Sequence, residues 1–185
     1  MEPIDSPAQV VCDAGPLIHL DELSYLNLLS DFAAVLVPGA VWSEVEQHRP
    51  RALEKATVPL VRVAVEISRE PGFDTLVRAL NLGAGEQAAL SLMQSYPGAI
   101  FLSDDAAARL AAKAFHFRSQ GTVGILLRSL RRGQCTRDQV LGLLQDIPKK
   151  STLHIRRGLL QSVIEDVKAG RAESSQPPDP SQRSG

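Results

Sequence analysis

The chain has 185 residues, 44% of them hydrophobic, which is enough to bury the core of one domain without disulfide bonds. Its formal net charge of −1 and its aromatic content of 4% argue against a uniformly basic nucleic-acid binder and against a surface that stacks bases on many aromatic rings. Any nucleic acid must therefore be held by local clusters of charge. Cys12 and Cys135 belong to no CxxC or Cys/His spacing, so neither a zinc site nor a redox motif is expected.

The N-terminal segment does not have the pattern of a secretion signal. It is acidic where a signal peptide is basic, and no apolar run in the chain approaches the roughly 20 residues that span a bilayer. We therefore expect a soluble protein of the reducing cytoplasm, with residues 1–8 as a short N-terminal extension.

Predicted strands and helices alternate along the chain. The apolar runs that predict strands cover residues 10–12, 35–38, 58–67 and 99–102. The helical patterns begin near residues 17, 38, 76, 86, 105, 122, 136 and 155. This alternation indicates parallel βαβ units, and a parallel sheet must be covered on both faces. We expect a three-layer α/β/α sandwich with a central, mostly parallel sheet.

The chain is predicted to divide into a globular part and a C-terminal region. Residues 9–147 carry the strand and helix pattern of the domain, and residues 148–170 form a C-terminal helical extension. Residues 171–185 contain no apolar residue except one alanine, so they cannot bury a core and are expected to be disordered.

Acidic residues directly follow two of the predicted strands. Asp13 comes after the first strand, and the pair Asp104 and Asp105 comes after residues 99–102. In open α/β sheets, ligands bind outside the carboxyl ends of the strands. We therefore expect these acids at one edge of the sheet.

Two glutamates can join them. Glu44 lies in the first turns of the helix that Pro38 opens, and Glu86 lies in the first turn of the helix after Gly83-Ala84-Gly85. A helix that follows a strand in such a sheet begins near the same edge. Glu44 and Glu86 therefore complete a set of candidate catalytic carboxylates.

Carboxylates gathered in this way require a counter-charge. Each like-charged pair at about 4 Å costs on the order of 4 kcal/mol at an effective dielectric constant of 20. Oxygen-only ligands select hard cations such as Mg²⁺ or Mn²⁺, which activate water and stabilise charge on a phosphodiester. The candidate metal ligands are Asp13, Glu86, Asp104 and Asp105.

Each acid also has an explanation without chemistry. An Asp after a strand can cap the next helix, and Asp13 can form an Asx turn. Glu44 and Glu86 are favourable near a helix N-terminus whatever their function, and this is the commoner role of such glutamates. Capping and metal binding can coexist in one side chain.

Taken in order along the chain, the motifs resemble the PIN domain family, in its bacterial and archaeal branch with an Asp-Ala-Gly-Pro-Leu-Ile opening. The resemblance covers about residues 9–145. The segments that carry it are Val11-Cys12-Asp13-Ala14-Gly15-Pro16-Leu17-Ile18, Val37-Pro38-Gly39-Ala40-Val41-Trp42-Ser43-Glu44, Leu82-Gly83-Ala84-Gly85-Glu86-Gln87-Ala88-Ala89, Leu102-Ser103-Asp104-Asp105-Ala106-Ala107-Ala108-Arg109 and Gly121-Thr122-Val123-Gly124-Ile125-Leu126.

This resemblance implies a PIN-like α/β/α fold, Mg²⁺ or Mn²⁺ at the carboxylates, and cleavage of RNA. Many similar proteins, such as VapC-type toxins, belong to type II toxin–antitoxin pairs and are held inactive by a small antitoxin protein. Homodimers are common among them. The implied partners are thus an RNA substrate, an antitoxin and a second copy of the chain, with no membrane.

The resemblance assigns Asp13, Glu44 and Glu86 directly. In the family, the fourth acid usually lies two residues after a Ser or Thr at the strand end, which favours Asp105 over Asp104, and we keep both as candidates. Many relatives have Ser or Thr two residues after the first Asp, where this chain has Gly15. The hydroxyl that supports the metal shell elsewhere is therefore missing here.

Basic residues near the Asp pair are candidates for binding RNA. Arg109 and Lys113 are four residues apart, so they share one helix face close to Asp104 and Asp105 and can hold phosphates. A solvated helix face explains them equally well. The chain also has four histidines, His19, His48, His116 and His154. None has the spacing to Ser, Cys or carboxylate that would build a catalytic triad.

We predict a metal-dependent endoribonuclease, the toxin of a toxin–antitoxin pair, with an inactive PIN-like nucleic-acid-binding or scaffold protein as the alternative. A phosphatase or nucleotide hydrolase on a similar scaffold would need a DxD arrangement or a GxxxxGK loop after the first strand. Neither is present there.

Overall fold

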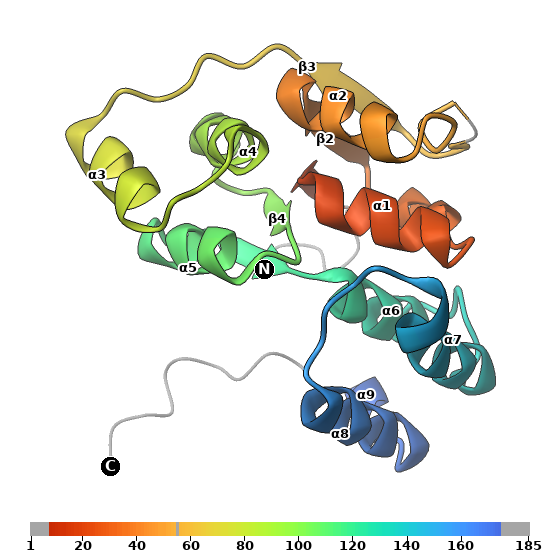
Figure 1. The fold of residues 1–185 in the computed structure, drawn as a ribbon. Helices are drawn as coiled ribbons and strands as arrows, with labels where there is room; N and C mark the ends of the chain where they lie inside the picture. The colour runs from red at the N-terminus through yellow and green to blue at the C-terminus, as the bar shows by residue number, and fades with distance from the viewer. Residues whose placement is uncertain (1–7, 55, 175–185) are drawn as a thin grey trace, which may run out of the picture.

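The computed structural model of the protein describes residues 8–54 and 56–174. In this part of the chain, five parallel strands form one sheet in the order β3-β2-β1-β4-β5. The strands are β1 (Gln9–Cys12), β2 (Ala34–Pro38), β3 (Leu60–Val63), β4 (Ile100–Leu102) and β5 (Arg118–Gln120). Helices cover both faces (Figure 1), so the predicted α/β/α sandwich is confirmed.

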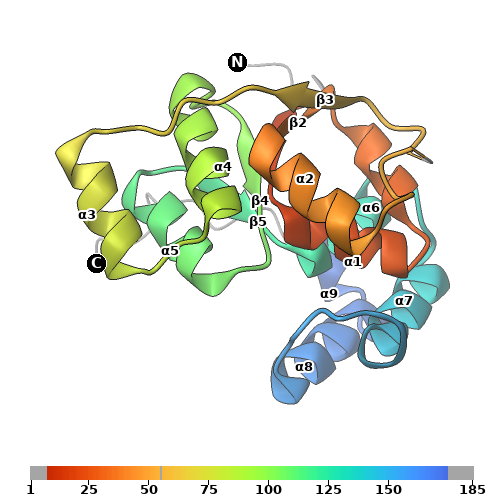
Figure 2. The same ribbon diagram turned by 45° about the horizontal axis from the view of Figure 1, so that its top comes forward.

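Helices connect and follow the strands. The helices before β5 are α1 (Ala14–Glu22), the 3₁₀ helix η1 (Leu26–Asp31), α2 (Gly39–His48), α3 (Pro71–Ala79), α4 (Ala84–Ser95) and α5 (Ala106–Ala114). The later ones are α6 (Thr122–Arg131), α7 (Arg137–Lys150), α8 (Arg157–Lys168) and α9 (Arg171–Ser174). Figures 1 and 2 both show α3, α4 and α5 together at one side of the molecule, with α7 at the opposite side.

The strand side chains alternate between two hydrophobic cores. Val10 and Cys12 of β1 belong to the core beneath α1, α6, α7 and α8, whereas Val11 belongs to the core beneath α3, α4 and α5. On β4, Phe101 faces the second core and Leu102 faces the first. Such strands are apolar on both faces, which is why they read as continuous apolar runs rather than as alternating patterns.

Two strands differ from the prediction. Residues 58–67 were expected to form one strand, but only Leu60–Val63 pair, because β3 is an edge strand whose single partner, β2, is itself short. The other edge strand, β5, was not predicted at all. Its residues, Arg118–Gln120, are polar, so they carry no apolar run, and pairing with β4 alone makes them a strand.

The leucine-rich helix predicted from residue 17 is also interrupted. Ser24 has a φ of 62°, which ends α1, and the chain continues into the 3₁₀ helix η1. The leucines of both elements are nevertheless buried in the same core. Their spacing therefore indicated burial correctly but overestimated the length of the helix.

The C-terminal region is folded against the domain. Helix α7 begins with a capping box made by Thr136 and Gln139, and α8 and α9 pack beside α6 and α7. Ala172 of α9 is 5% exposed and joins the core, so the prediction of disorder from residue 171 is wrong for residues 171–174. Residues 1–7 of the predicted extension and 175–185 of the predicted tail lie outside the described residues. None of the described helices combines the length and apolarity needed to cross a bilayer.

Candidate active site

The acidic residues meet at the carboxyl ends of β1 and β4. These strands pair directly, with Cys12 opposite Leu102, and the amide of Asp13 donates a hydrogen bond of 2.9 Å to the carbonyl of Leu102. A cavity of about 300 Å³ opens at this edge of the sheet. Its lining includes all five predicted acids, namely Asp13, Glu44, Glu86, Asp104 and Asp105.

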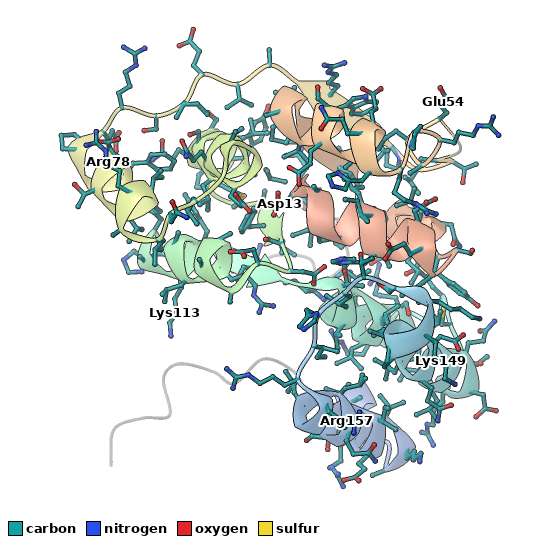
Figure 3. The ribbon with its side chains drawn as sticks, in the orientation of Figure 1. Asp13, Glu54, Arg78, Lys113, Lys149 and Arg157 are labelled. Atoms are coloured by element: carbon teal, nitrogen blue, oxygen red, sulfur yellow. The ribbon has the colours of Figure 1, made fainter. Side chains whose placement is uncertain are left out.

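Asp13 lies between the start of α1 and α4 (Figure 3). Its side chain is buried, and the residue is only 5% exposed. Its Oδ2 accepts a hydrogen bond of 2.9 Å from the hydroxyl of Ser103, which is fully buried after β4. Burial raises the pKa of Asp13 to about 7; hydrogen bonds from the Ala14 amide and from Ser103 oppose this rise, and the nearby charges of Glu86 and Glu44 add to it. The carboxyl group of Asp13 is therefore partly protonated near neutral pH, and a nearby positive charge would favour its ionised form.

Gly83, the N-cap of α4, and Gly85 in its first turn make room for the glutamates. A Cβ at position 85 would lie 2.9 Å from Oε2 of Glu44 and 3.6 Å from Oδ1 of Asp13. A Cβ at position 83 would lie 2.6 Å from Oε2 of Glu86. The absence of side chains at Gly83 and Gly85 thus allows three carboxylates to approach the start of α4.

Burial and a nearby carboxylate change the pKa of Glu44. Partial burial raises the pKa of Glu44, the charge of Glu86 raises it further, and His48 opposes the shift. The carboxylates of Glu44, Glu86 and Asp13 therefore interact, although they come from α2, α4 and the end of β1. This convergence is the feature that the sequence predicted from element order.

The two acids after β4 have different environments. Asp105 is exposed and caps α5, since its Oδ1 accepts a hydrogen bond of 2.7 Å from the Ala108 amide. Asp104 is mostly buried and accepts three hydrogen bonds, from the Thr122 amide (2.7 Å), the Thr122 hydroxyl (2.6 Å) and Nδ1 of His19 (2.8 Å). The expected helix cap is confirmed for Asp105, and the other acid is tied into a hydrogen-bond network.

This network determines the charge of Asp104. Burial alone would raise the pKa of Asp104, but the hydrogen bonds from His19 and Thr122 outweigh burial and lower the pKa. The carboxylate is therefore ionised at neutral pH and acts as the acceptor, so Nδ1 of His19 carries the proton that they share. Both carboxylate oxygens of Asp104 already accept hydrogen bonds. The second oxygen of Asp105 has no hydrogen-bond partner among the described residues.

His19 was not predicted to be a site residue, yet its side chain lines the cavity. The available signal was its position four residues after Gly15, which places both residues on one face of α1, and this face meets Asp104. Thr152, Leu153 and His154 also line the cavity, from the segment between α7 and α8. No local pattern links that segment to Asp13, so its presence could only be found in the structure.

A family model described as a PIN domain matches residues 9–169 of the chain. The chain belongs to the PIN domain family. The match extends through α8, beyond residue 147. A comparison with curated proteins gave no match. PIN domains are typically nucleases, and the acids of this PIN domain lie where its parallel sheet presents a ligand site.

The donor set of this PIN domain suits a hard divalent cation, because the cavity is lined by several carboxylates and by no thiolate. As placed, however, the described residues include no group of three or more His, Cys, Asp or Glu side chains that encloses a metal position. Mg²⁺ is commonly held by one or two carboxylates while its waters fill the remaining positions. The residues lining the cavity therefore fit an ion of this kind, one that needs only one or two protein carboxylates.

The predicted RNA-binding residues of the PIN domain are not equivalent in position. Arg109 lines a second cavity that also contains Asp104, and its Nη1 lies 3.0 Å from the position of a Cβ at residue 121. Lys113 is exposed near the end of α5 and projects outward (Figure 3). It lines neither this cavity nor the carboxylate cavity. Only Arg109 is therefore close to the Asp pair in the way that the sequence suggested.

Proposed function

We propose that the protein is a metal-dependent endoribonuclease that hydrolyses phosphodiester bonds in RNA. The observation that carries this proposal is the convergence of Asp13, Glu44 and Glu86 with the two acids after β4 around one cavity. A buried carboxylate with a pKa of about 7 is destabilised when it is ionised alone. A bound divalent cation would remove that penalty, which gives the acids a reason to be together.

Asp13, Glu86 and the second oxygen of Asp105 would hold Mg²⁺ or Mn²⁺. Such an ion, when bound, supplies an activated water and stabilises negative charge on the phosphodiester. Ser103 fixes the rotamer of Asp13 through the bond to Oδ2, and α5 fixes Asp105 through its cap. Glu44, whose raised pKa makes it a better base at neutral pH, would accept a proton from the attacking water at Oε2.

RNA cleavage tests the proposal directly. Purified full-length protein, incubated with a fluorescent single-stranded RNA and Mg²⁺ or Mn²⁺, is expected to cut it, and EDTA is expected to stop the reaction. Asp13→Asn should reduce the rate by at least ~100-fold, because it removes a charge from the metal ligands. Glu66→Gln is the matched control, since Glu66 is exposed and lies outside the cavity. Equal rates for Asp13→Asn and wild type would overturn the proposal.

The competing function is a PIN-like protein that binds nucleic acid or acts as a scaffold without catalysis. It predicts no cleavage, and it predicts no dependence of Mn²⁺ binding on Asp13. Isothermal titration of the metal-free protein with Mn²⁺ separates the two functions independently of the substrate. Binding that is lost in Asp13→Asn and retained in Glu66→Gln supports the enzyme.

We further propose that the protein is the toxin of a toxin–antitoxin pair in the cytoplasm. The support is the resemblance of its motifs to VapC-type toxins, and the two free thiols, Cys12 and Cys135, suit a reducing compartment. The expected outcome is growth arrest on induction, relieved by the product of a small neighbouring reading frame and absent for Asp13→Asn. A homodimer, which is common among similar proteins, would be measured by light scattering.

A further inference from the structure

The segment between α7 and α8 is fixed to the end of α1 by one carboxylate. Glu22, the last residue of α1, accepts hydrogen bonds from the Ser151 hydroxyl (2.9 Å), the Thr152 amide (2.7 Å) and the Thr152 hydroxyl (3.0 Å). Burial would raise the pKa of Glu22, but these hydrogen bonds outweigh it and lower the pKa. An ionised Glu22 therefore holds residues 151 and 152 in place next to the carboxylate cavity.

The residues that follow Thr152 line two neighbouring cavities. Leu153 and His154 line the carboxylate cavity and also a second cavity of about 550 Å³ between α5, the start of α6 and α8. Asp104 is the third residue that both cavities share. Figure 1 shows the segment, in blue, rising from α7 past α6 before it turns down into α8. The second cavity is thus a continuation of the candidate active site.

The charge of the second cavity is opposite to that of the first. Its lining includes Arg109, Arg156 and His154, and the only acid among its lining residues is Asp104, whose oxygens are occupied by His19 and Thr122. In the part of the chain that the structure describes, neither guanidinium has an ion-pair or hydrogen-bond partner. Two unpaired arginines beside an acidic centre form a binding site for anionic groups that flank the reacting one.

The remaining walls of the second cavity are apolar. Leu159 is 57% exposed on α8, and Ile155, Val123 and Val163, which line the same cavity, are partly buried. A volume of about 550 Å³ is that of pockets for drug-sized ligands, which matches unpaired nucleotides and not a duplex. Single-strand binding combines cations that follow the phosphates with side chains, usually aromatic, that cover the base faces. In this cavity the apolar surface available to a base is aliphatic.

We propose that α5, the start of α6 and residues 153–163 form a subsite that binds the flank of a single-stranded RNA whose scissile phosphate lies at the carboxylate cavity. Arg109 of α5 and Arg156 at the start of α8 bind phosphates, and Leu159 packs against a base. This subsite rests on the proposed nuclease function for its substrate, but its residues lie largely outside the carboxylate set. It also gives the C-terminal segment a role in selecting unpaired RNA.

Binding to a labelled 12-nucleotide single-stranded RNA in EDTA, where cleavage is prevented, tests the subsite. Arg109→Ala and Arg156→Ala are each expected to raise the Kd about 5- to 10-fold and to reduce the slope of log K against log salt by about 0.7. Leu159→Ser should weaken binding without changing the slope. Arg157→Ala is the matched control, because Arg157 is exposed on α8 beside Arg156 (Figure 3) and outside the cavity.

Two results would overturn the subsite. One is that Arg109→Ala and Arg156→Ala bind the RNA as tightly as Arg157→Ala does. The other is that an acidic peptide rich in leucine binds in an Arg156-dependent manner while the RNA does not, which would make the occupant a protein segment. A hairpin RNA of the same length should bind more weakly than the single strand, and equal affinity would also contradict the proposal.

A parallel cleavage assay separates this proposal from the nuclease proposal. If the wild type cuts RNA and the arginine variants cut and bind it equally well, the subsite is wrong and the nuclease function stands. If the wild type cuts nothing but its RNA affinity depends on Arg109 and Arg156, the subsite stands as part of a binding protein and the nuclease function fails.

Discussion

Nδ1 of His19 donates a hydrogen bond of 2.8 Å to Oδ2 of Asp104, and this contact lies directly beside Gly15. A Cβ at position 15 would be 3.4 Å from Oδ2 of Asp104 and 3.6 Å from Cε1 of His19. The polar neighbour of Asp104 on α1 is therefore an imidazole, and position 15 contributes only space. The missing hydroxyl at Gly15 thus does not leave the acids without support from α1.

Removing His19 should affect the protein chiefly at neutral pH. His19→Ala deletes a hydrogen bond to an ionised group, which typically contributes about 1.5–3 kcal/mol. The lowered pKa of Asp104 stabilises the fold above the unfolded pKa, and that stabilisation is lost as pH falls through the folded pKa. The deficit of His19→Ala in urea unfolding should therefore be larger at pH 7 than at pH 3. A deficit that is equal at both pH values would assign the effect to packing alone, and His19→Gln, which keeps a donor, should recover part of it.

Asp13→Asn should stabilise the metal-free protein at high pH. The folded pKa of Asp13 is about 7, against 3.8 for the ordinary group, so its contribution is fully present below pH 3.8 and is lost as pH rises through 7. The cost of ionising it in the fold is on the order of 4 kcal/mol, taking 1.36 kcal/mol for each pKa unit. Thermal unfolding in EDTA should give a higher Tm for Asp13→Asn than for wild type at pH 8.

The same experiment contains its own control. The lowered pKa values of Asp104 and Glu22 make the fold lose stability on the acidic side, and Asp13→Asn should leave that loss unchanged. Mn²⁺ should raise the Tm of wild type at pH 8 and not that of Asp13→Asn. If the two proteins have the same Tm from pH 5 to pH 8 without metal, the carboxyl of Asp13 is not destabilised when it is ionised.

Gly85→Ala should separate stability from activity. The added Cβ would lie 2.9 Å from Oε2 of Glu44, the end of a flexible side chain, so Glu44 moves at little cost. Alanine also gains about 1 kcal/mol over glycine inside a helix. We expect unchanged or higher stability together with at least a ~10-fold loss of cleavage rate, because Glu44 leaves its position.

Gly142→Ala provides the comparison for this variant. Gly142 lies inside α7, and a Cβ there would meet nothing within 4 Å. It should gain similar stability from helix propensity and retain full activity. If both glycine variants are equally active, Glu44 does not need its observed position.

Glu22→Ala should weaken RNA binding from a distance. Glu22 lines neither cavity, but its loss frees the Ser151 and Thr152 donors and loosens the segment that carries His154 and Arg156. We expect an increase in Kd similar to that of Arg156→Ala, with faster amide hydrogen exchange in residues 151–156. Asp146→Ala, which breaks only the exposed pair with Lys150 on α7, should change neither measurement. Unchanged exchange in Glu22→Ala would mean that other contacts hold the segment.

The acids were predictable because their positions depend on local rules. Asp13 follows a buried strand, and a parallel sheet delivers the residues after its strands to one edge. Glu44 and Glu86 follow from the same reasoning applied to the helices that begin there. The difference between Asp104 and Asp105 was not predictable from spacing, because it depends on Thr122 and His19, which contact Asp104 from two other helices.

The parts that the sequence did not predict are those fixed by distant contacts. β5 is polar and becomes a strand only because β4 offers it an edge. The segment 151–156 reaches the cavity because Glu22 binds it across 129 residues of chain. Hydrophobic periodicity carries no information about such polar contacts, since one carboxylate on α1 resembles any other surface acid.

The order β3-β2-β1-β4-β5 has a consequence for synthesis of the protein on the ribosome. β1 is the central strand, so the sheet is built outward from it, first toward β3 and only later toward β5. The acids are incomplete until residue 105 has been made, and the wall formed by residues 152–156 comes last. A chain that ends before residue 152 therefore lacks part of the cavity wall, and the complete candidate site forms only after most of the chain has been translated.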